Sequence, residues 1–311
     1  MSSGGDRAVL RLAESTSHSE PGVPVDEFLE EPALRAALAA PLGLQALAWP
    51  GVGTVYHRRR LGLTQLELAP LGLYAAPSAS LESFIDSAPG RASRVTLNVD
   101  PLDSRSDALA ARAAAGGWRV LQRETHLLAL DRTLDELRRG YHATKRAQVR
   151  REPALPWRID CVRDAMALDA YYGLYTAAAA RWGRSGPPYP RRLLEAVLAS
   201  PAAELWLMHV RERPACAMIV LVGRRFALYW QGASHIDDDQ KAAFPMVRLM
   251  DTVIGSLLAR GVPCLNLGAS DGLPNVRRFK EEFGARAAGY PTLIHESTVW
   301  RTLARLRRAT G

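Results

Sequence analysis

The sequence predicts an α/β protein of two units, each a mixed and largely antiparallel sheet flanked by helices. Helical and strand patterns alternate along residues 25–130 and again from Asp131 onward, as in layered α/β folds. Closely spaced runs of apolar residues in both parts indicate antiparallel meanders. The chain has 311 residues, and at roughly 100–200 residues per domain this length favours two domains.

Composition limits the class of protein and its partners. Hydrophobic residues make up 48% of the chain and charged residues 23%, which is typical of a globular protein and excludes disorder throughout. The net charge of +8 favours a polyanionic partner such as RNA, a nucleotide or an anionic lipid headgroup, although a solvated basic surface explains it equally well. Cys161, Cys216 and Cys264 stand alone in apolar segments, so they indicate neither a disulfide framework nor a metal site.

The first residues carry little structural signal. Residues 1–22 are rich in Ser, Gly and Pro and are expected to be flexible. They lack a basic segment followed by an apolar run, and no segment approaches the ~20 apolar residues that span a bilayer. We therefore expect a cytoplasmic protein without a transmembrane segment.

Residues 23–130 form the first predicted domain. A helix is expected around Pro32, which either starts or interrupts it. Three apolar runs bounded by Gly and Pro then predict a strand meander, LQALAWPG, GTVYHRRR and TQLELAPLGLY. The remaining expected elements are a short helix at 80–87, a strand at 94–100, a helix at 106–116 closed by Gly116 and Gly117, and a strand at 118–130.

Residues 131–311 form the second predicted domain. Thr133 and Glu136 match a capping box, so one helix should begin there and continue to Glu152, before Pro153. The elements expected after it are a strand at 157–162, a helix at 164–182, a helix at 191–198, the meander strands ELWLMHV, ACAMIVLVG and RFALYWQGAS, a helix at 244–258, the strand PCLNLG, a short helix, the strand YPTLIHEST and a basic helix at 302–308. The basic helix is most simply a solvated tail.

Basic side chains follow one stripe of the expected helix at 133–152. The candidates for contact with the phosphates of a polyanion are Arg139, His142, Arg146 and Arg150, spaced i, i+3, i+7 and i+11, with Lys145 and Arg151 flanking them. Acidic residues are almost absent after Glu136, so pairing within the helix does not explain the arginines. The stripe is either a phosphate-binding ridge or a solvated face.

The order of elements over residues 131–295 resembles the acyltransferase fold of the GNAT superfamily. The segments DRTLDELRRGYHATKRAQVRR, GASHIDDDQKAAFPMVRLMDTVIGSLLARGVPCLNLGASDG and RRFKEEFG resemble the Fem-type branch, whose members carry two GNAT-like domains in tandem. The resemblance covers residues 130–290 well and residues 20–125 poorly. It implies an enzyme that transfers an acyl group to a primary amine; in the peptidyltransferase members this is an aminoacyl group taken from its tRNA.

The segment LNLGASDGLPNVRRFKEEFG, from Leu265 to Gly284, joins a strand, a polar loop and a helical turn. The resemblance implies that Lys280 contacts the negative charge that develops at the acyl centre and that Phe279 sets its position. An ammonium held in a dry site stabilises such an oxyanion. Asp271 could accept a proton from the attacking amine, or it could simply form the turn with Gly272. Without the resemblance, Lys280 would be interpreted as a surface lysine.

Five further residues are assigned to the substrate site. Tyr229, Trp230 and Gln231 could line an acceptor pocket, although aromatic residues of a meander strand are more often core. Ser270 and Arg278, on either side of the polar turn, are assigned to the same site.

The identity of the acyl donor is inferred from a motif that the sequence lacks. GNAT proteins that use acetyl-CoA hold its pyrophosphate in an [RQ]xxGx[GA] loop at a helix start, and this chain has no such loop. Asp237, Asp238 and Asp239 stand there instead, and three carboxylates repel a pyrophosphate. We therefore expect aminoacyl-tRNA as co-substrate, a small-molecule or peptide amine as acceptor, and no cofactor, metal or DNA partner. The alternatives are an acyl-CoA or carrier-protein thioester donor and, in another class, a non-catalytic RNA-binding protein.

Overall fold

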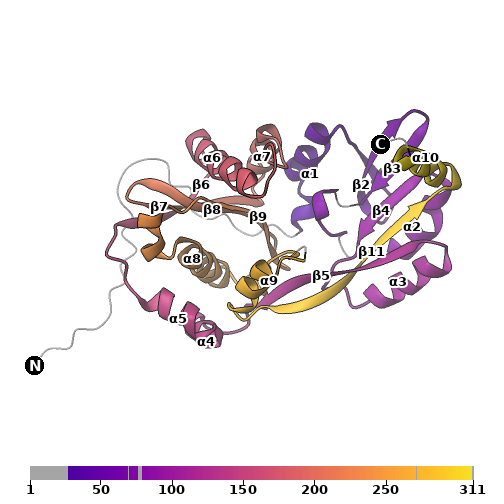
Figure 1. Ribbon diagram of the computed structural model, residues 1–311. Helices are drawn as coiled ribbons and strands as arrows, with labels where there is room; N and C mark the ends of the chain where they lie inside the picture. Colours follow the sequence, from indigo (N-terminus) through magenta and orange to yellow (C-terminus); the bar gives the residue numbers. More distant parts are fainter. Residues whose placement is uncertain (1–26, 69, 76–78, 271, 310–311) are drawn as a thin grey trace, which may run out of the picture.

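The structure is a computed structural model that describes residues 27–68, 70–75, 79–270 and 272–309. The expected flexible segment at 1–22 lies outside the described residues. One mixed sheet of eleven strands runs through the protein in the order β1-β2-β3-β4-β11-β5-β10-β9-β8-β7-β6, and helices lie on both of its faces (Figure 1). The predicted fold class is confirmed, and the sheets of the two halves are joined into one.

The strands lie close to their predicted positions. They are β1 (Gln45–Trp49), β2 (Gly53–Arg60), β3 (Leu63–Glu67), β4 (Arg94–Asn98), β5 (Arg119–Ala129), β6 (Trp157–Val162), β7 (Ala203–Val210), β8 (Arg213–Val222), β9 (Ala227–Ser234), β10 (Cys264–Asn266) and β11 (Arg286–Glu296). Strands β1–β3 and β6–β9 are antiparallel meanders, so both predicted meanders are confirmed.

The helices are α1 (Pro32–Ala39), α2 (Leu81–Ser87), α3 (Ser106–Ala115), α4 (Leu134–Gly140), α5 (Ala143–Arg150), α6 (Ala165–Arg181), α7 (Arg191–Leu198), α8 (Pro245–Ala259), α9 (Pro274–Glu281) and α10 (Thr298–Ala309). Short 3-10 turns lie at η1 (Phe28–Glu30), η2 (Ala40–Leu42), η3 (Pro70–Gly72), η4 (Ala88–Gly90) and η5 (Asp238–Ala243). Pro32 starts α1, and the Glu31 carboxylate accepts hydrogen bonds from the next free N–H groups, Ala33 N at 3.0 Å and Leu34 N at 2.6 Å.

Strand β11 departs from a simple division of the chain at residue 130. The predicted second domain, 131–311, includes it, yet β11 pairs with β4 and β5 of the first half. The reason lies in β5, whose two edges are used differently. Only Leu127, Leu128 and Ala129 pair with β10 on one side, whereas β11 pairs with residues 119–127 on the other and protects that long edge.

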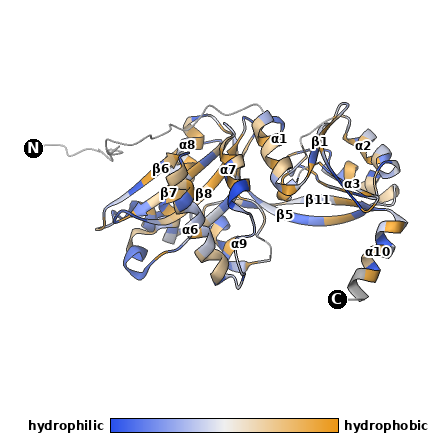
Figure 2. Ribbon diagram, turned by 90° about the horizontal axis from the view of Figure 1, so that it is seen from above, coloured by the Kyte–Doolittle hydropathy of each residue, from blue (hydrophilic) through white to orange (hydrophobic). Residues whose placement is uncertain are grey.

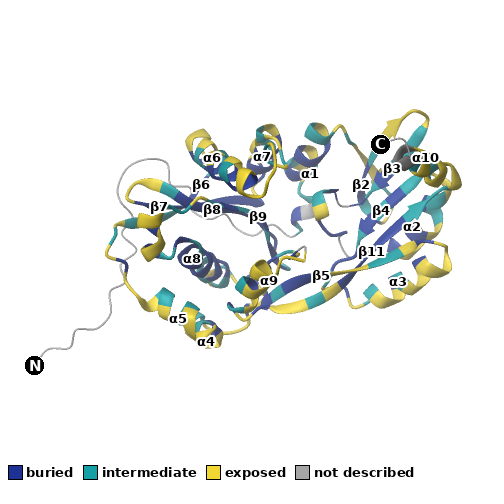
Figure 3. Ribbon diagram, viewed as in Figure 1, coloured by how far each residue is buried: buried dark blue, intermediate teal, exposed yellow. Residues whose placement is uncertain are grey.

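Three apolar clusters stabilise the sheet. One lies between the sheet and α6, α7 and α1 and includes Tyr74 of the first half and Tyr290 of β11. A second lies under α8 and α4, and a third under α2 and α3. Figure 3 shows the central strands and α8 as buried. Because α1 packs on α7, the first cluster joins the two halves of the chain.

One helical stretch has the length and hydropathy of a membrane span. It runs over Asp238–Ala259, and 56% of its most apolar window is buried inside the protein. Its helix α8 packs on β7 and β8, so its apolar residues are used in the core.

Candidate active site

The sheet changes character at the end of β10, where the two halves meet. Strands β9 and β10 are parallel and pair only through Ala227 with Leu265 and Leu228 with Asn266. Beyond this point β10 ends. Strand β9 contains a bulge there: Tyr229 pairs with Val220 and Gln231 with Ile219, the next residue of β8, so one residue of β9 has no partner in the register. The extra residue bends β9. The loop at 267–273 and α9 follow this strand end.

Lys280 lies in α9 and is only 3% exposed. Its Nζ donates hydrogen bonds to two carbonyl oxygens of the loop after β10, Gly268 O at 2.8 Å and Ala269 O at 2.6 Å. The loop turns at Gly268, whose φ of 74° is left-handed and therefore suits glycine. Carbonyl dipoles offset the cost of burying an ammonium, so the charge of Lys280 is held at the end of β10.

Phe279 precedes Lys280 in α9 and contacts other residues. Its ring lies 5.2 Å from the ring of Phe283, and the Nζ of Lys145 lies 5.0 Å from its centre. Lys145 also pairs with Glu282 at 3.2 Å. Phe279 therefore attaches α9 to α5, and its suggested part in positioning Lys280 stays a prediction.

His126 is the candidate functional residue that the sequence interpretation missed. Its side chain is fully buried in β5, and its Nδ1 lies 3.4 Å from the Oγ of Ser270, itself 7% exposed. The other ring nitrogen, Nε2, lies 3.8 Å from a carboxylate oxygen of Glu281. Burial first, and then the charge of Lys280, lower the pKa of His126, so the ring is neutral at neutral pH. The available signal was a histidine inside the apolar run THLLAL.

On the other face of the same strand ends lies a buried polar cluster of Thr125, Asn266 and Tyr74. The Asn266 Oδ1 accepts hydrogen bonds from Thr125 Oγ1 at 2.6 Å and from Gly268 N at 2.8 Å. Its Nδ2 is buried without a hydrogen-bond partner among the described residues. Burial raises the pKa of Tyr74, while hydrogen bonds with Thr125 and Asn266 oppose the rise. Asn266 thus links Thr125 to the loop that Lys280 holds.

The structure separates the three β9 residues assigned to substrate. Tyr229 packs on the α8 side of the sheet. Its hydroxyl occupies the space beside Gly232, 1.8 Å from where a Cβ would stand. Trp230 belongs to the α6 side, stacked on Tyr189 with ring centres 5.5 Å apart, and its Nε1 is buried without a partner in the described chain. Gln231 accepts a hydrogen bond from the hydroxyl of Tyr175 at 3.5 Å. Tyr229 therefore lies across the sheet from Trp230 and Gln231, which both contact the α6 side.

Two other residues of the assigned site fall outside the buried cluster. Arg278 has a side chain that is 75% exposed and pairs with Glu282 one turn later at 2.9 Å. Asp271 lies outside the described residues, so its suggested role stays a prediction. Among the described residues no group of three His, Cys, Asp or Glu side chains could hold a metal ion.

The single helix predicted for residues 133–152 is wrong. The capping box of Thr133 and Glu136 is present at the start of α4, but the helix breaks at Tyr141 and His142, where ψ is 151° and 146°. The cause is tertiary. Tyr141 is buried against Phe283 and hydrogen-bonds Asp251 at 3.2 Å, while the N–H of His142 donates to Glu282 O at 2.8 Å.

The break ends the predicted stripe, because its members now lie on two helices. Arg146 donates to the carbonyls of Arg139 and Tyr141, at 3.0 and 2.5 Å, and so joins α5 to the end of α4. His142 caps α5 by accepting from Thr144 N at 3.3 Å. The remaining exposed members are Arg139, Arg150 and Arg151, the last over the ring of Phe244 at 5.9 Å. A basic surface remains, smaller than predicted.

The acidic loop after β9 also differs from its predicted effect. Its carboxylates are paired: Arg213 contacts Asp237 and Asp239 at 2.6 Å each, and Lys241 contacts Asp238 at 2.6 Å. The loop therefore does not present three free carboxylates that would repel a pyrophosphate. The backbone gives another obstacle to a pyrophosphate. The chain forms the 3-10 turn η5, capped by Asp237 itself, and α8 then starts at Pro245, which has no N–H.

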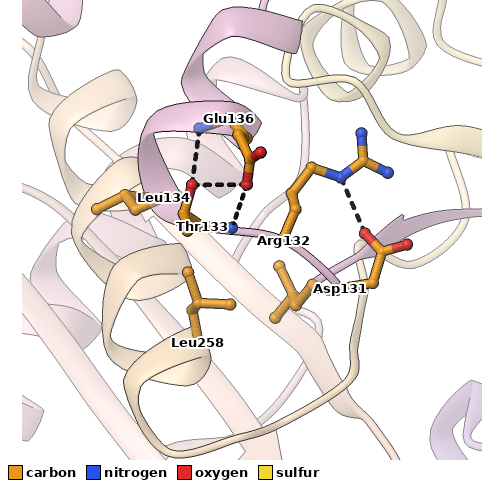
Figure 4. Close-up of a pocket in the computed structure, with 7 residues that line it drawn as sticks. Asp131, Arg132, Thr133, Leu134, Glu136 and Leu258 are labelled. Atoms are coloured by element: carbon orange, nitrogen blue, oxygen red, sulfur yellow. Dashed lines mark hydrogen bonds and ion pairs between the residues drawn. The ribbon is translucent and has the colours of Figure 1, made fainter.

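A surface hollow elsewhere carries no comparable chemistry. It lies where β5 leads into α4 and is lined by Leu130, Asp131, Arg132, Thr133, Leu134, Glu136 and Leu258. Figure 4 shows its polar side chains turned to one another, Arg132 to Asp131 and Thr133 to Glu136. These groups are satisfied within the turn, so the cluster around Lys280 is the better candidate.

Comparisons with known proteins agree with this geometry. Residues 138–281 match the family described as acetyltransferase (GNAT) domain. This match includes β9, β10 and Lys280. No curated protein matches the chain by sequence.

Solved structures extend the likeness to both halves. FemX superposes with a TM-score of 0.65 at 14% identity, over 85% of this chain and 94% of that one. The C-terminal domain of a protein described as a lysylphosphatidylglycerol synthetase, from Agrobacterium fabrum, gives 0.57 at 14% identity, over 88% and 91%. A tandem GNAT protein from the clavulanic acid biosynthesis pathway gives 0.50 at 13% identity, over 85% and 87%. At such identities the likeness establishes the fold.

Proposed function

We propose that the protein, whose residues 138–281 match the acetyltransferase (GNAT) domain family, transfers an aminoacyl group from aminoacyl-tRNA to a primary amine by direct attack. The observation that carries the proposal is Lys280, a buried ammonium held by Gly268 O and Ala269 O where β9 and β10 part. A positive charge that is already in place stabilises an oxyanion without reorganisation.

The reaction needs one charge stabilised and one proton moved. The amine nitrogen bonds to the ester carbon, and the carbonyl electron pair moves to oxygen beside Lys280. Collapse restores the carbonyl and breaks the bond to the ribose oxygen of the tRNA. The proton lost by the amine passes through Ser270 to the neutral ring of His126, 3.4 Å away, and returns to the ribose oxygen. No covalent enzyme intermediate is needed.

Three features support tRNA as donor. The Fem-type resemblance implies it, and FemX shares the fold over most of both chains. The exposed arginines of α4 and α5, Arg139 and Arg150, lie on the same packed unit as α9 through Lys145 and Glu282 and suit phosphate contact. The helix start that holds a pyrophosphate in acetyl-CoA enzymes is blocked here by η5 and Pro245. We place the enzyme in the cytoplasm, where charged tRNA is made.

A thioester donor is the second candidate. It is favoured by one observation, the fold shared with a tandem GNAT protein of the clavulanic acid biosynthesis pathway, which was solved without AcCoA. Lys280 would stabilise the oxyanion formed from a thioester in the same way. The two candidates differ in the donor and not in the acyl chemistry.

A transfer assay separates them. Purified protein is incubated with a dipeptide amine and either tRNA charged with radiolabelled amino acids or labelled acetyl-CoA, with and without ribonuclease pretreatment. We expect amide product from charged tRNA alone, lost after ribonuclease and lost in Lys280→Met, which keeps side-chain length. Product from acetyl-CoA that survives ribonuclease would overturn the tRNA proposal.

A further inference from the structure

The helix α10 and the β2–β3 hairpin come together at one end of the sheet, away from Lys280. The register shows this directly, because Glu296 at the end of β11 pairs with Arg94, Arg94 with Gln65 of β3, and Gln65 with Arg58 of β2. Helix α10 begins two residues after Glu296. Figure 2 shows it extending from the sheet at the end opposite β6 and β7.

This end exposes large apolar side chains from two elements. On α10, Val299 is 59% exposed, Leu303 39% and Leu306 58%, and their spacing of i, i+4 and i+7 puts them on one helix face. On the hairpin, Leu61 is 81% exposed. The opposite side of α10 is attached to the sheet, where the guanidinium of Arg94 lies 5.7 Å from the ring of Trp300.

The turn that carries Leu61 is itself unusual. Leu61 and Gly62 both have positive φ, 51° and 76°, as in the two-residue hairpin turns that favour Asn-Gly. A leucine in the left-handed region is strained, and strain of this kind tends to be kept where it serves a function. Here it places an apolar side chain at the tip of the hairpin.

Arginines surround these apolar side chains. Those exposed on the hairpin and α10 are Arg58, Arg59, Arg60, Arg301 and Arg305. Arg58 donates to Gln65 and Arg301 to Thr298, both neutral. Glu296, in the same row of the register, is 3.6 Å from Arg94. The surface is therefore strongly positive and apolar at once.

We propose that this end of the molecule, the hairpin tip at 58–62 together with α10, docks on an anionic lipid surface. The combination of an apolar helix face with flanking arginines is that of a helix that lies in a membrane interface, and anionic headgroups attract such arginines. RNA would use the arginines but leave Leu61, Val299 and Leu303 in water. A second copy of the chain would bring two arginine clusters against each other. The proposal does not depend on the reaction at Lys280.

Vesicle sedimentation of the full chain tests the proposal. We expect binding to vesicles of phosphatidylcholine mixed with phosphatidylglycerol, none to phosphatidylcholine alone, and weakening with salt. Arg59→Gln with Arg60→Gln should reduce binding on the order of tenfold or more, since each arginine near such a surface contributes about fivefold. Val299→Ser with Leu303→Ser should also reduce it.

Two controls make the result decisive. Arg139→Gln with Arg150→Gln removes the same charge from α4 and α5, and Met166→Ser removes an apolar side chain that is 82% exposed on α6; both should bind vesicles as the wild type does. An equal loss in Arg139→Gln with Arg150→Gln would show attraction by net charge alone, and an equal loss in Met166→Ser would show that any exposed apolar side chain suffices. Either result would overturn the proposal. A loss of tRNA binding, with vesicle binding intact, in Arg59→Gln with Arg60→Gln would assign the surface to RNA instead.

Discussion

Lys280 and the arginines of α4 and α5 present positive charge in opposite ways. Lys280 is buried and hydrogen-bonded to two backbone carbonyls, whereas Arg139 and Arg150 are exposed. A buried, oriented charge acts strongly over a short distance, as an oxyanion requires. Exposed charges act weakly over longer distances and are screened by salt, which suits the approach of a polyanion. Arg146 resembles Lys280, because its side chain also donates hydrogen bonds to two backbone carbonyls.

The largest effect is expected from Lys280→Met, which removes the buried charge and keeps the apolar stem. Turnover in the transfer assay should fall about 10²–10³-fold, the usual loss when one oxyanion donor is removed, while KM for charged tRNA changes little. Single-turnover kinetics and filter binding measure the two quantities.

A matched variant guards against loss of structure, since the loop at 268–270 also depends on Lys280. Lys280→Arg keeps the charge and shifts its position, so it should fold like the wild type and recover only part of the rate. If Lys280→Met retained full turnover, the comparison drawn above would fail, and Lys280 would only hold the loop.

The next effect is a contrast between Arg146→Ala and the pair Arg139→Ala with Arg150→Ala. Arg146→Ala leaves two carbonyls at the break without their donor and should lower the free energy of unfolding by about 1–2 kcal/mol. The exposed pair should leave stability nearly unchanged and reduce the salt dependence of tRNA binding by up to about two phosphate contacts.

Urea denaturation and tRNA binding at several salt concentrations measure both sides of this contrast. If the exposed pair destabilised the protein as much as Arg146→Ala, or left the salt dependence unchanged, the division into anchoring and binding arginines would be wrong.

The smallest effect concerns pH and the neutral ring of His126. Its pKa is lowered by burial and by Lys280, so below pH about 6.5 the unfolded chain binds more protons than the folded chain. The stability present above that pH is lost as pH falls toward the folded pKa, at no more than about 1.4 kcal/mol per pH unit for one proton. His126→Gln should make the free energy of unfolding depend less on pH between about pH 5 and 8, the range in which histidine titrates. Denaturation at several pH values in this range measures the effect. An acid slope as steep as that of the wild type would mean that other groups cause it.

Much of the fold followed from local patterns. Alternating apolar residues predicted both meanders, and Thr133 with Glu136 predicted the start of α4, because a capping box depends only on residues three apart. The helix break at Tyr141 could not be predicted in this way, since it depends on Phe283, Asp251 and Glu282 far along the chain.

The candidate site was predicted in part. Lys280 was found from a motif, and the structure places it with Ser270, another predicted residue. His126 was missed because it comes to Lys280 only through the pairing of β5 with β10. Tyr229 and Trp230 were assigned to one pocket although adjacent strand residues point to opposite faces of a sheet. The bulge, which the sequence pattern does not reveal, lets both Trp230 and Gln231 contact the α6 side. The paired state of Asp237 and Asp239 likewise depends on Arg213 of another strand.

The position of β11 has a consequence for how the protein is made. The hydroxyl of Thr292 bonds to Asn98, 194 residues earlier, and β4 and β5 meet only through β11. During synthesis from the N-terminus, residues 94–129 leave the ribosome long before residues 286–296, so their strand edges stay open while the second half emerges. Pairing over such separations is slow, and open edges invite aggregation. The sheet of the first half therefore cannot be completed before residues 286–296 have been synthesised.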